Sequence, residues 1–87
     1  MVSLGVKKGV PDLCLPVRRR GYTACWVELK AAHPQKWEMS EDQRRWMDRL
    51  RQEGALAEMC RGWKEAADLL TWYLDPEARL PRRGVAV

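Results

Sequence analysis

The sequence predicts an α/β domain in which a small mixed sheet is flanked by two helices. Three observations support this fold class. Two strand-like segments occur at 12–17, where apolar and polar residues alternate, and at 22–29; helical periodicity follows over 40–53 and 63–74; and a short apolar run lies between the helices at 55–60. At 87 residues, the chain can form only one small domain with a modest core.

An arginine-rich turn joins the first predicted strand, 12–17, to the second, 22–29. Arg19, Arg20 and Gly21 fit a three-residue hairpin loop, because glycine adopts the left-handed conformation that closes such a loop without steric cost. We therefore expect an antiparallel hairpin whose register is set by this turn.

That register places two acidic residues opposite each other. If Arg18 pairs with Tyr22, then Asp12 lies opposite Glu28, with Cβ atoms about 5 Å apart. Period-2 alternation puts Lys30 on the same face as Glu28. Two carboxylates held this close repel each other unless a cation lies between them or one takes a proton. The pair therefore suits a hard divalent ion bound through oxygen.

The segment 40–53 has the start and stop signals of a helix. Ser40 is the expected N-cap, and Gln43 at the third helical position completes a capping box. Gly54 ends the helix. Positions three or four residues apart form the expected buried stripe: Trp46, Met47 and Leu50.

A third strand is predicted at 55–60 and a second helix at 63–74. Because strand, helix and strand follow in series, a right-handed crossover should make the third strand parallel to the strand that contains Glu28. The spacing predicts a buried face on the second helix formed by Ala66, Ala67, Leu70 and either Tyr73 or Leu74. We expect a domain over 1–75, followed by a basic, disordered tail over 76–87.

The net charge of +4, from 16 Lys and Arg against 12 Asp and Glu, favours polyanionic partners. Basic residues precede the first acid, fill the hairpin turn and recur in the tail at Arg79, Arg82 and Arg83. Each cluster alone is compatible with an ordinary solvated surface, but clusters that bracket a carboxylate site favour contacts with phosphate. The candidate DNA-binding residues are Lys7, Lys8, Arg18, Arg19, Arg20 and Arg44.

Several classes of protein are disfavoured. No apolar run approaches the roughly 20 residues that a membrane span needs, and no secretory signal is visible, so we expect a cytoplasmic protein without membrane contacts. Cys14, Cys25 and Cys60 are odd in number and form no Cys-x-x-Cys pair, which favours buried free thiols over a zinc site or a disulfide. His33 is the only histidine, which disfavours a histidine-based nuclease mechanism.

Three motifs occur in order on the predicted elements, and together they resemble those of the VRR-NUC domain, a branch of the PD-(D/E)XK nucleases. The motifs are Gly9-Val10-Pro11-Asp12-Leu13, Glu28-x-Lys30, and Ser40-x-x-Gln43 with Trp46. Each motif alone is common, whereas the ordered set is more specific. The resemblance extends from about Gly5 to Leu74 and implies a restriction-endonuclease-like core.

The resemblance also implies roles for individual residues. Asp12 and Glu28 would ligate Mg²⁺ or Mn²⁺, and the backbone carbonyl of Leu29 would be a further ligand. Lys30 would position or activate the attacking water, which is consistent with the compact charge of a lysine beside a scissile phosphate. Gln43 would help to order the site, and a purely capping role for Gln43 is the alternative.

The resemblance implies a metal-dependent DNA endonuclease. Stand-alone members resemble Holliday junction resolvases, which cut four-way junctions as homodimers. A homodimer is also expected on physical grounds, because a small sheet exposes its edges and the hairpin should expose apolar residues around Leu13, Leu15 and Val27.

Members of the family usually begin with a helix that contributes another acidic residue, and nothing before Lys7 can form that helix. Two alternatives to an active nuclease therefore stay open. One is a non-catalytic DNA-binding module of the same fold, and the other is an interaction fragment of a larger protein.

Overall fold

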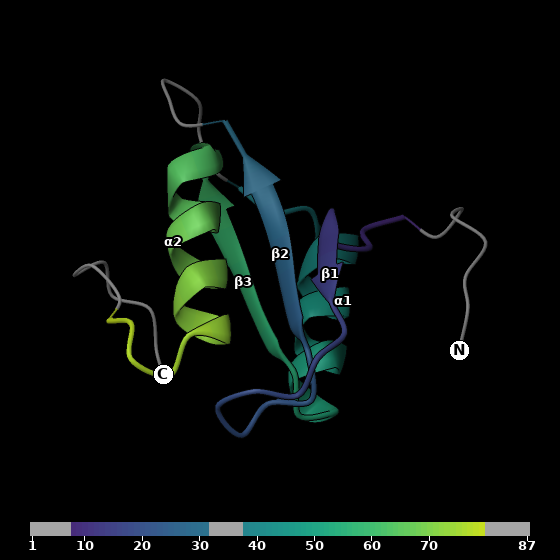
Figure 1. The fold of residues 1–87 in the computed structure, drawn as a ribbon. Coiled ribbons are helices and arrows are strands. Elements are labelled where there is room, and N and C mark those ends of the chain that lie inside the picture. Colours follow the sequence, from purple (N-terminus) through teal and green to yellow (C-terminus); the bar gives the residue numbers. More distant parts are fainter. Residues whose placement is uncertain (1–7, 32–37, 80–87) are drawn as a thin grey trace.

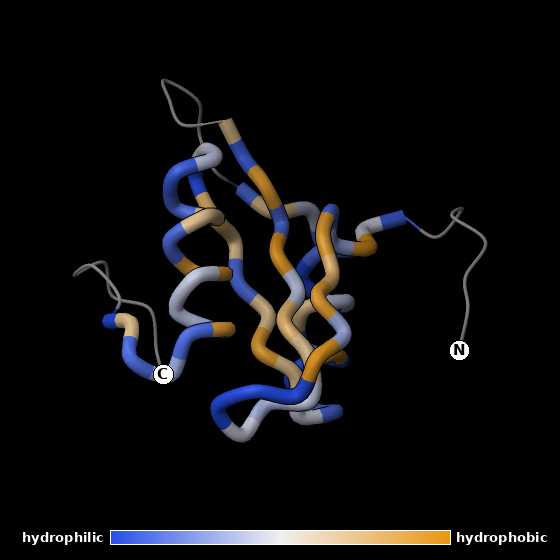
Figure 2. The backbone as a smooth tube through the Cα atoms, in the orientation of Figure 1, coloured by the Kyte–Doolittle hydropathy of each residue, from blue (hydrophilic) through white to orange (hydrophobic). Residues whose placement is uncertain are grey.

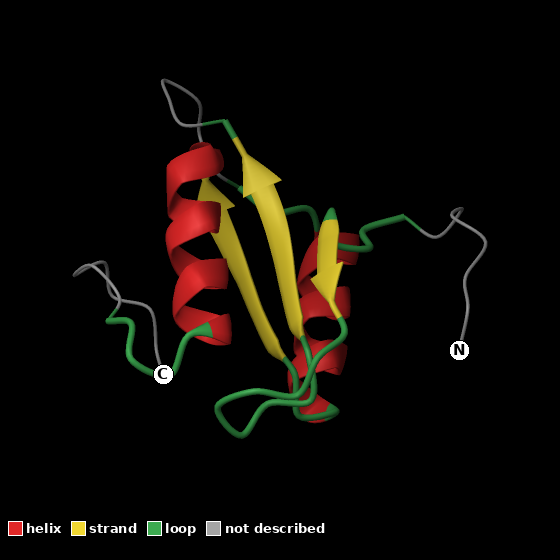
Figure 3. Ribbon diagram, in the orientation of Figure 1, coloured by secondary structure: helices red, strands yellow, loops and turns green. Residues whose placement is uncertain are grey.

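The computed structural model describes residues 8–31 and 38–79 of the chain. The elements in chain order are β1 (Leu13–Leu15), β2 (Cys25–Lys30), α1 (Glu41–Gln52), β3 (Leu56–Arg61) and α2 (Gly62–Leu74). They form one three-stranded sheet in the order β1-β2-β3 with two helices, which confirms the predicted fold class (Figures 1 and 3). No helix within the described ranges is long and apolar enough to cross a membrane.

The strands pair as the sequence predicts. β1 is antiparallel to β2, and β3 is parallel to β2. In the hairpin, the Cα partners are Leu13 with Val27, Cys14 with Trp26, and Leu15 with Cys25. β1 has only three residues, fewer than predicted. It is short because Pro11 and Pro16 lie on either side of it, and neither has an N–H for a strand ladder.

The hairpin turn differs from the predicted one. Arg19 and Tyr22 exchange backbone hydrogen bonds of 3.2 and 2.8 Å, so the loop between them contains two residues. Arg20 and Gly21 have φ angles of 50° and 83°, as in a type I′ turn. The prediction of a three-residue loop with Arg18 opposite Tyr22 was therefore wrong.

The first arm of the hairpin accommodates one extra residue, and this restores the predicted register. The N–H of Val17 donates to the carbonyl of Leu15 at 2.8 Å, which makes a tight turn centred on Pro16. The shorter loop and the extra residue compensate for each other. Figure 2 shows that the loop joining β1 to β2 is the most hydrophilic part of the hairpin, whereas the strands are largely apolar.

Helix α1 begins with the predicted capping box. The Ser40 hydroxyl accepts from the Gln43 N–H at 3.1 Å, and the Gln43 side chain accepts from the Ser40 N–H at 2.8 Å. Met47 is buried, while Trp46 and Leu50 are half-buried beside it. The predicted start and apolar stripe of this helix are therefore confirmed.

The main core lies between α2 and one face of the sheet. Its buried members are Cys25, Val27, Leu56, Cys60, Ala66, Leu69, Trp72 and Tyr73. Leu13 and Leu15 pack against this cluster, and Val27 is fully buried. The expectation that these residues are exposed was wrong for Val27, because α2 covers β2, whereas Leu13 and Leu15 on the edge strand β1 are half-buried.

The buried face of α2 also differs from the predicted one. Apolar residues occupy a wide arc of the helix, and the sheet covers the part that contains Leu69 and Trp72. Ala66 and Tyr73 are buried as predicted, whereas Ala67 is exposed and Leu70 is half-buried. Trp63 and Leu74 are 68% and 44% exposed, so an apolar stripe faces outward.

Arg20 connects the hairpin turn to the C-terminal end of α2. Its Nε donates to the carbonyl of Trp72 at 2.8 Å, and its Nη2 donates to the carbonyls of Asp75 and Ala78 at 3.0 Å. The guanidinium also lies 4.1 Å from the centroid of the Trp72 ring. A cation at this helix end satisfies carbonyls that have no helical partner.

The outer edge of β3 also contacts an arginine. The Leu56 N–H bonds to the carbonyl of Ala24 beside β2, so alternation turns the backbone of Ala57 away from β2. The Ala57 carbonyl accepts bonds of 3.1 and 2.7 Å from Nε and Nη2 of Arg51. This edge group is therefore already occupied.

The cysteines are free, as predicted, but they are not all buried. Cys25 and Cys60 are in the core, whereas Cys14 is exposed. Cys14 lies on the face of β1 that points away from α2, which explains the wrong prediction for this residue. Burial and then the proximity of Cys60 raise the pKa of Cys25 to about 12, so this thiol stays neutral.

Candidate active site

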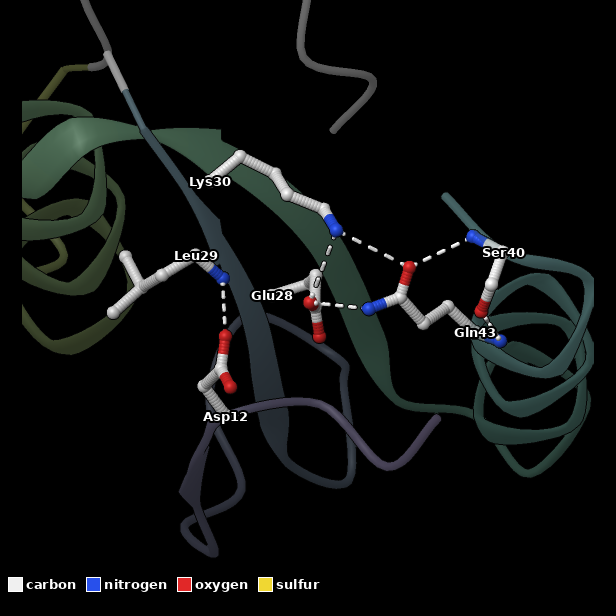
Figure 4. Close-up of polar contacts among 6 residues, drawn as sticks. All are labelled: Asp12, Glu28, Leu29, Lys30, Ser40 and Gln43. Carbon is white, nitrogen blue, oxygen red and sulfur yellow. Dashed lines mark hydrogen bonds and ion pairs between the residues drawn. The ribbon is translucent and has the colours of Figure 1, made fainter. Parts of the chain in front are cut away.

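The candidate site centres on Glu28, which is only 5% exposed. Its Oε2 accepts a hydrogen bond from Nε2 of Gln43 at 2.7 Å and lies 3.6 Å from Nζ of Lys30 (Figure 4). Lys30 Nζ also donates to Oε1 of Gln43 at 3.2 Å. These three side chains therefore form a closed polar network between β2 and α1.

The capping box places Gln43 in this network. Its Oε1 accepts from the Ser40 N–H as well as from Lys30, while its Nε2 contacts Glu28. Gln43 therefore makes both the capping contacts and the site contacts that the sequence left as alternatives. One amide connects the start of α1 to the carboxylate and the ammonium on β2.

Asp12 lies directly before β1, one position beyond the pair formed by Leu13 and Val27. The register therefore brings Asp12 and Glu28 to neighbouring positions, as predicted. Oδ2 of Asp12 accepts from the Leu29 N–H at 2.8 Å (Figure 4). The Asp12 side chain is thus held at the edge of β2.

The ionisation of Glu28 reflects this crowding. Burial raises the pKa of Glu28, and the negative charge of Asp12 raises it further. The charge of Lys30 and its hydrogen bond act in the opposite direction, but the overall shift is upward. A cation between the two carboxylates would favour the ionised form of both.

The backbone of Leu29 belongs to the same edge. Its N–H points to Asp12, and in an extended strand the N–H and C=O of one residue point to the same side. The Leu29 carbonyl therefore faces the edge of β2 where Asp12 lies. This is the placement that the predicted carbonyl ligand requires.

The donor set fits a hydrated divalent ion. Within the described ranges, the second carboxylate oxygens, Oδ1 of Asp12 and Oε1 of Glu28, accept no hydrogen bond. Two carboxylates and one carbonyl are hard oxygen donors, and Mg²⁺ or Mn²⁺ bound by so few of them keeps several waters. No group of three or more His, Cys, Asp or Glu side chains in the described part of the chain could hold a metal.

Two of the predicted phosphate-binding residues lie near the acidic site. Arg44 is exposed in the first turn of α1, next to Gln43, and Lys8 is exposed just before Gly9. Gly9 packs against the backbone of Asp42 in that same turn. Lys8 and Arg44 therefore flank the start of α1. Lys7 lies outside the described residues.

Gly9 opens the first motif, but no role was predicted for it from the sequence. It has a φ of +87°, and an added Cβ would lie 2.5 Å from the carbonyl carbon of Asp42. A side chain at this position would push the segment before Asp12 away from α1. The available signal was the glycine three residues before Asp12.

The arginines of the hairpin turn lie elsewhere. The turn is at the opposite end of the sheet from the C-terminal end of β2 (Figure 1). Arg18 and Arg19 are exposed there, and the guanidinium of Arg20 is bonded to carbonyls at the end of α2. The structure does not bring these three residues to the carboxylates.

Comparisons with known proteins agree with this geometry. The family model described as the VRR-NUC domain matches residues 3–64. A solved structure of a VRR_NUC domain protein is similar over 88% of this chain, with a TM-score of 0.74 and 23% sequence identity. This chain spans 61% of the length of that chain, and the likeness establishes the fold. No curated protein matches the chain.

Proposed function

The chain belongs to the VRR-NUC domain family, and on this premise we propose that it is a metal-dependent DNA endonuclease. The observation that supports this best is the contact network of Glu28, Lys30 and Gln43 beside Asp12. This network places the carboxylate oxygens of Asp12 and Glu28, which suit a hard cation, beside the positively charged ammonium of Lys30. That combination suits hydrolysis of a phosphodiester.

The proposed cofactor is Mg²⁺ or Mn²⁺, bound by Asp12, Glu28 and the Leu29 carbonyl. When bound, such an ion polarises the scissile phosphodiester and neutralises charge that develops on it. Lys30 then holds the attacking water and stabilises negative charge near Glu28, while Gln43 fixes the orientation of both side chains. Lys8 and Arg44 bind flanking phosphates as exposed cations.

A cleavage assay tests the proposal. The chain is incubated with four-way-junction, flap, duplex and single-stranded DNA, with and without Mn²⁺. We expect metal-dependent cleavage that falls by at least about a hundredfold in Asp12→Asn, Glu28→Gln and Lys30→Ala, because the first two changes weaken binding of the ion and the third removes the positive charge beside the attacking water.

Asp48→Asn is the matched control. Asp48 is an exposed acid on α1 whose one ion pair within residues 8–31 and 38–79 is a 3.9 Å contact with Arg51, so its loss should leave cleavage unchanged. Wild-type turnover in any of the three site variants would remove the role proposed for that residue.

The preferred substrate proposed here is a four-way junction, cut by a homodimer. The outward stripe of α2 supports a dimer. Its members, Trp63, Ala67, Leu70 and Leu74, recur at intervals of four, three and four residues, as on a helix that packs against another helix. The stripe borders a hollow of about 550 Å³ lined in part by Trp63, Ala67 and Leu70.

This stripe is complementary to a second copy of itself. In an antiparallel pair about a two-fold axis, Trp63 of each copy meets Leu74 of the other, and Ala67 meets Leu70, so a large residue faces a smaller one at each level.

Two charged variants test this arrangement. Trp63→Lys and Leu74→Glu each place a charge in the pairing surface, so each alone should sediment as a monomer at micromolar concentration. Mixed together, they should form a heterodimer, because Lys at 63 then meets Glu at 74 of the partner. Gln52→Glu, on the exposed end of α1, is the control and should sediment like the wild type.

Monomeric wild-type protein would contradict the dimer. A mixture of the two charged variants that fails to associate would contradict the antiparallel register. Neither result depends on cleavage.

A second candidate function is a DNA-binding module without catalysis. The observation that favours it is the small number of acidic ligands, since Asp12 and Glu28 are the only carboxylates of the described residues at this site. DNA binding without cleavage of any of the four substrates in Mn²⁺ would support this candidate over the endonuclease.

A further inference from the structure

Pro11 lies at a particular point of the hairpin ladder. Continuing the pairs of β1 and β2 from Leu13 and Val27 places Pro11 opposite Leu29. Pro11 is buried, directly before Asp12 and just beyond the end of β1. It is therefore the residue that would form the next rung of the ladder with Leu29.

The hydrogen bonds of the ladder show which groups this rung would use. The Leu29 N–H points toward the β1 side of β2, so alternation makes Val27 and Leu29 the residues of β2 that exchange bonds with β1 in this region. At the Val27 level, the partner is Leu13. At the Leu29 level, the partner position should accept from the Leu29 N–H and donate an N–H to the Leu29 carbonyl.

Pro11 cannot complete this exchange because it has no N–H. The Leu29 carbonyl therefore lacks its ladder donor. The Leu29 N–H is satisfied instead by Oδ2 of Asp12 at 2.8 Å. The N–H of Leu29 is therefore bonded to a side-chain carboxylate, while its carbonyl has no hydrogen-bond donor from β1.

We infer that Pro11 is a positioning residue that keeps the Leu29 carbonyl free to ligate the divalent ion. The inference rests on the metal-dependent function proposed above. By ending the ladder one rung early, Pro11 leaves the Leu29 carbonyl without a backbone donor, on the edge of β2 where Asp12 accepts from the Leu29 amide. A residue with an N–H at position 11 would close the rung and occupy the carbonyl.

The test compares residues at position 11 that differ in the N–H. In Pro11→Ala, the new amide should bond to Leu29, and Mn²⁺ affinity measured by calorimetry should fall about tenfold, because a carbonyl engaged in a backbone bond is a poorer ligand. In the metal-free protein, the residue 11 amide of this variant should be protected from hydrogen exchange. Pro16→Ala, at the other end of β1, is the matched control and should keep wild-type Mn²⁺ affinity.

A chemically synthesised chain with N-methylalanine at position 11 separates the N–H from the ring. This residue has no N–H, and like alanine it lacks the pyrrolidine ring. It should restore wild-type Mn²⁺ affinity if the missing donor is what matters. If the loss in Pro11→Ala came only from the ring or from packing, N-methylalanine would not restore affinity, and the inference would be overturned.

The outcomes distinguish this inference from the proposed function. Unchanged Mn²⁺ affinity in Pro11→Ala, or rapid exchange of its residue 11 amide without metal, overturns the role of Pro11 alone. A wild-type chain that binds no Mn²⁺ overturns the proposed metal dependence. In that case, the exchange measurement still decides whether the ladder ends at Pro11.

Discussion

At the scale of single residues, the raised pKa of Glu28 predicts a pH-dependent stability in the metal-free protein. Burial and then the negative charge of Asp12 raise the pKa of Glu28 in the folded chain above the ordinary value of 4.5, which holds in the unfolded chain. At pH values between these two pKa values, the folded chain therefore binds more protons than the unfolded chain. The free energy of unfolding should therefore fall as pH rises through this window. Glu28→Gln removes this titration. The free energy of unfolding of the variant, relative to that of the wild type, should therefore increase as pH rises through this window and stay constant at higher pH.

Urea denaturation at a series of pH values between about 4 and 8 measures this difference. A stability difference between Glu28→Gln and the wild type that does not change with pH would show that Glu28 titrates normally in the folded protein.

The two functions of Gln43 can be separated at the residue scale as well. Ser40→Ala removes the hydroxyl that accepts from the Gln43 N–H, which should cost about 1 kcal/mol of stability. It leaves the contacts of Gln43 with Glu28 and Lys30 in place, so cleavage should be nearly unchanged. Gln43→Ala should lower both stability and cleavage, as thermal denaturation and turnover will show. Equal loss of cleavage in both variants would mean that the cap, and not the side-chain contacts, supports the site.

At the scale of elements, Gly9 holds the segment before β1 against the first turn of α1. Gly9→Ala should destabilise the protein by more than the roughly 1 kcal/mol expected for a positive φ alone, because its Cβ would overlap Asp42. Gly21→Ala is the matched control: Gly21 has a similar φ of +83° and nothing within 4 Å of the added Cβ. Denaturation curves of the two variants should therefore differ, and identical losses would show that the contact with Asp42 is unimportant.

Arg20 should act on the stability of α2 and not on DNA binding. Arg20→Ala removes three hydrogen bonds to carbonyls near the end of α2, and we expect a loss of about 1 to 2 kcal/mol. Arg18→Ala, on the exposed side of the same turn, should leave stability unchanged. Thermal denaturation and DNA titration at several salt concentrations distinguish the two. Weaker DNA binding in Arg20→Ala with unchanged stability would reverse this assignment.

The elements also show which parts of the fold could be predicted from sequence. The capping box of α1 depends on Ser40 and Gln43 alone, and such local signals predict a helix start well. The buried face of α2 depends on tertiary contacts, because two apolar arcs compete and only the packed sheet selects Leu69 and Trp72 over Leu70 and Leu74.

The candidate site was predictable because it depends on register more than on loop shape. The turn was predicted wrongly, but a two-residue loop with one extra residue at Pro16 leaves Asp12 and Glu28 at the same relative positions as a three-residue loop. The contacts of Arg20 with α2 were not predictable, since they join residues more than 50 positions apart.

At the scale of the whole molecule, metal binding should stabilise the fold. An ion that binds only the folded chain raises the melting temperature by mass action. Mn²⁺ should raise it more than Mg²⁺, because Mg²⁺ demands stricter octahedral geometry and loses its waters reluctantly. Calorimetric melting of the wild type and of Asp12→Asn/Glu28→Gln measures this. A Mn²⁺ shift that survives in the double variant would place the metal elsewhere.

Both edges of the sheet are protected against pairing with another chain. Pro11 and Pro16 limit the open edge of β1 to three residues, and Arg51 occupies the Ala57 carbonyl on the outer edge of β3. An incoming chain therefore finds few unpaired backbone groups in a row, so growth of a cross-β fibril from the folded state is disfavoured on both sides. With a net charge of +4 and both sheet edges protected in this way, the folded protein should stay dispersed in concentrated solution.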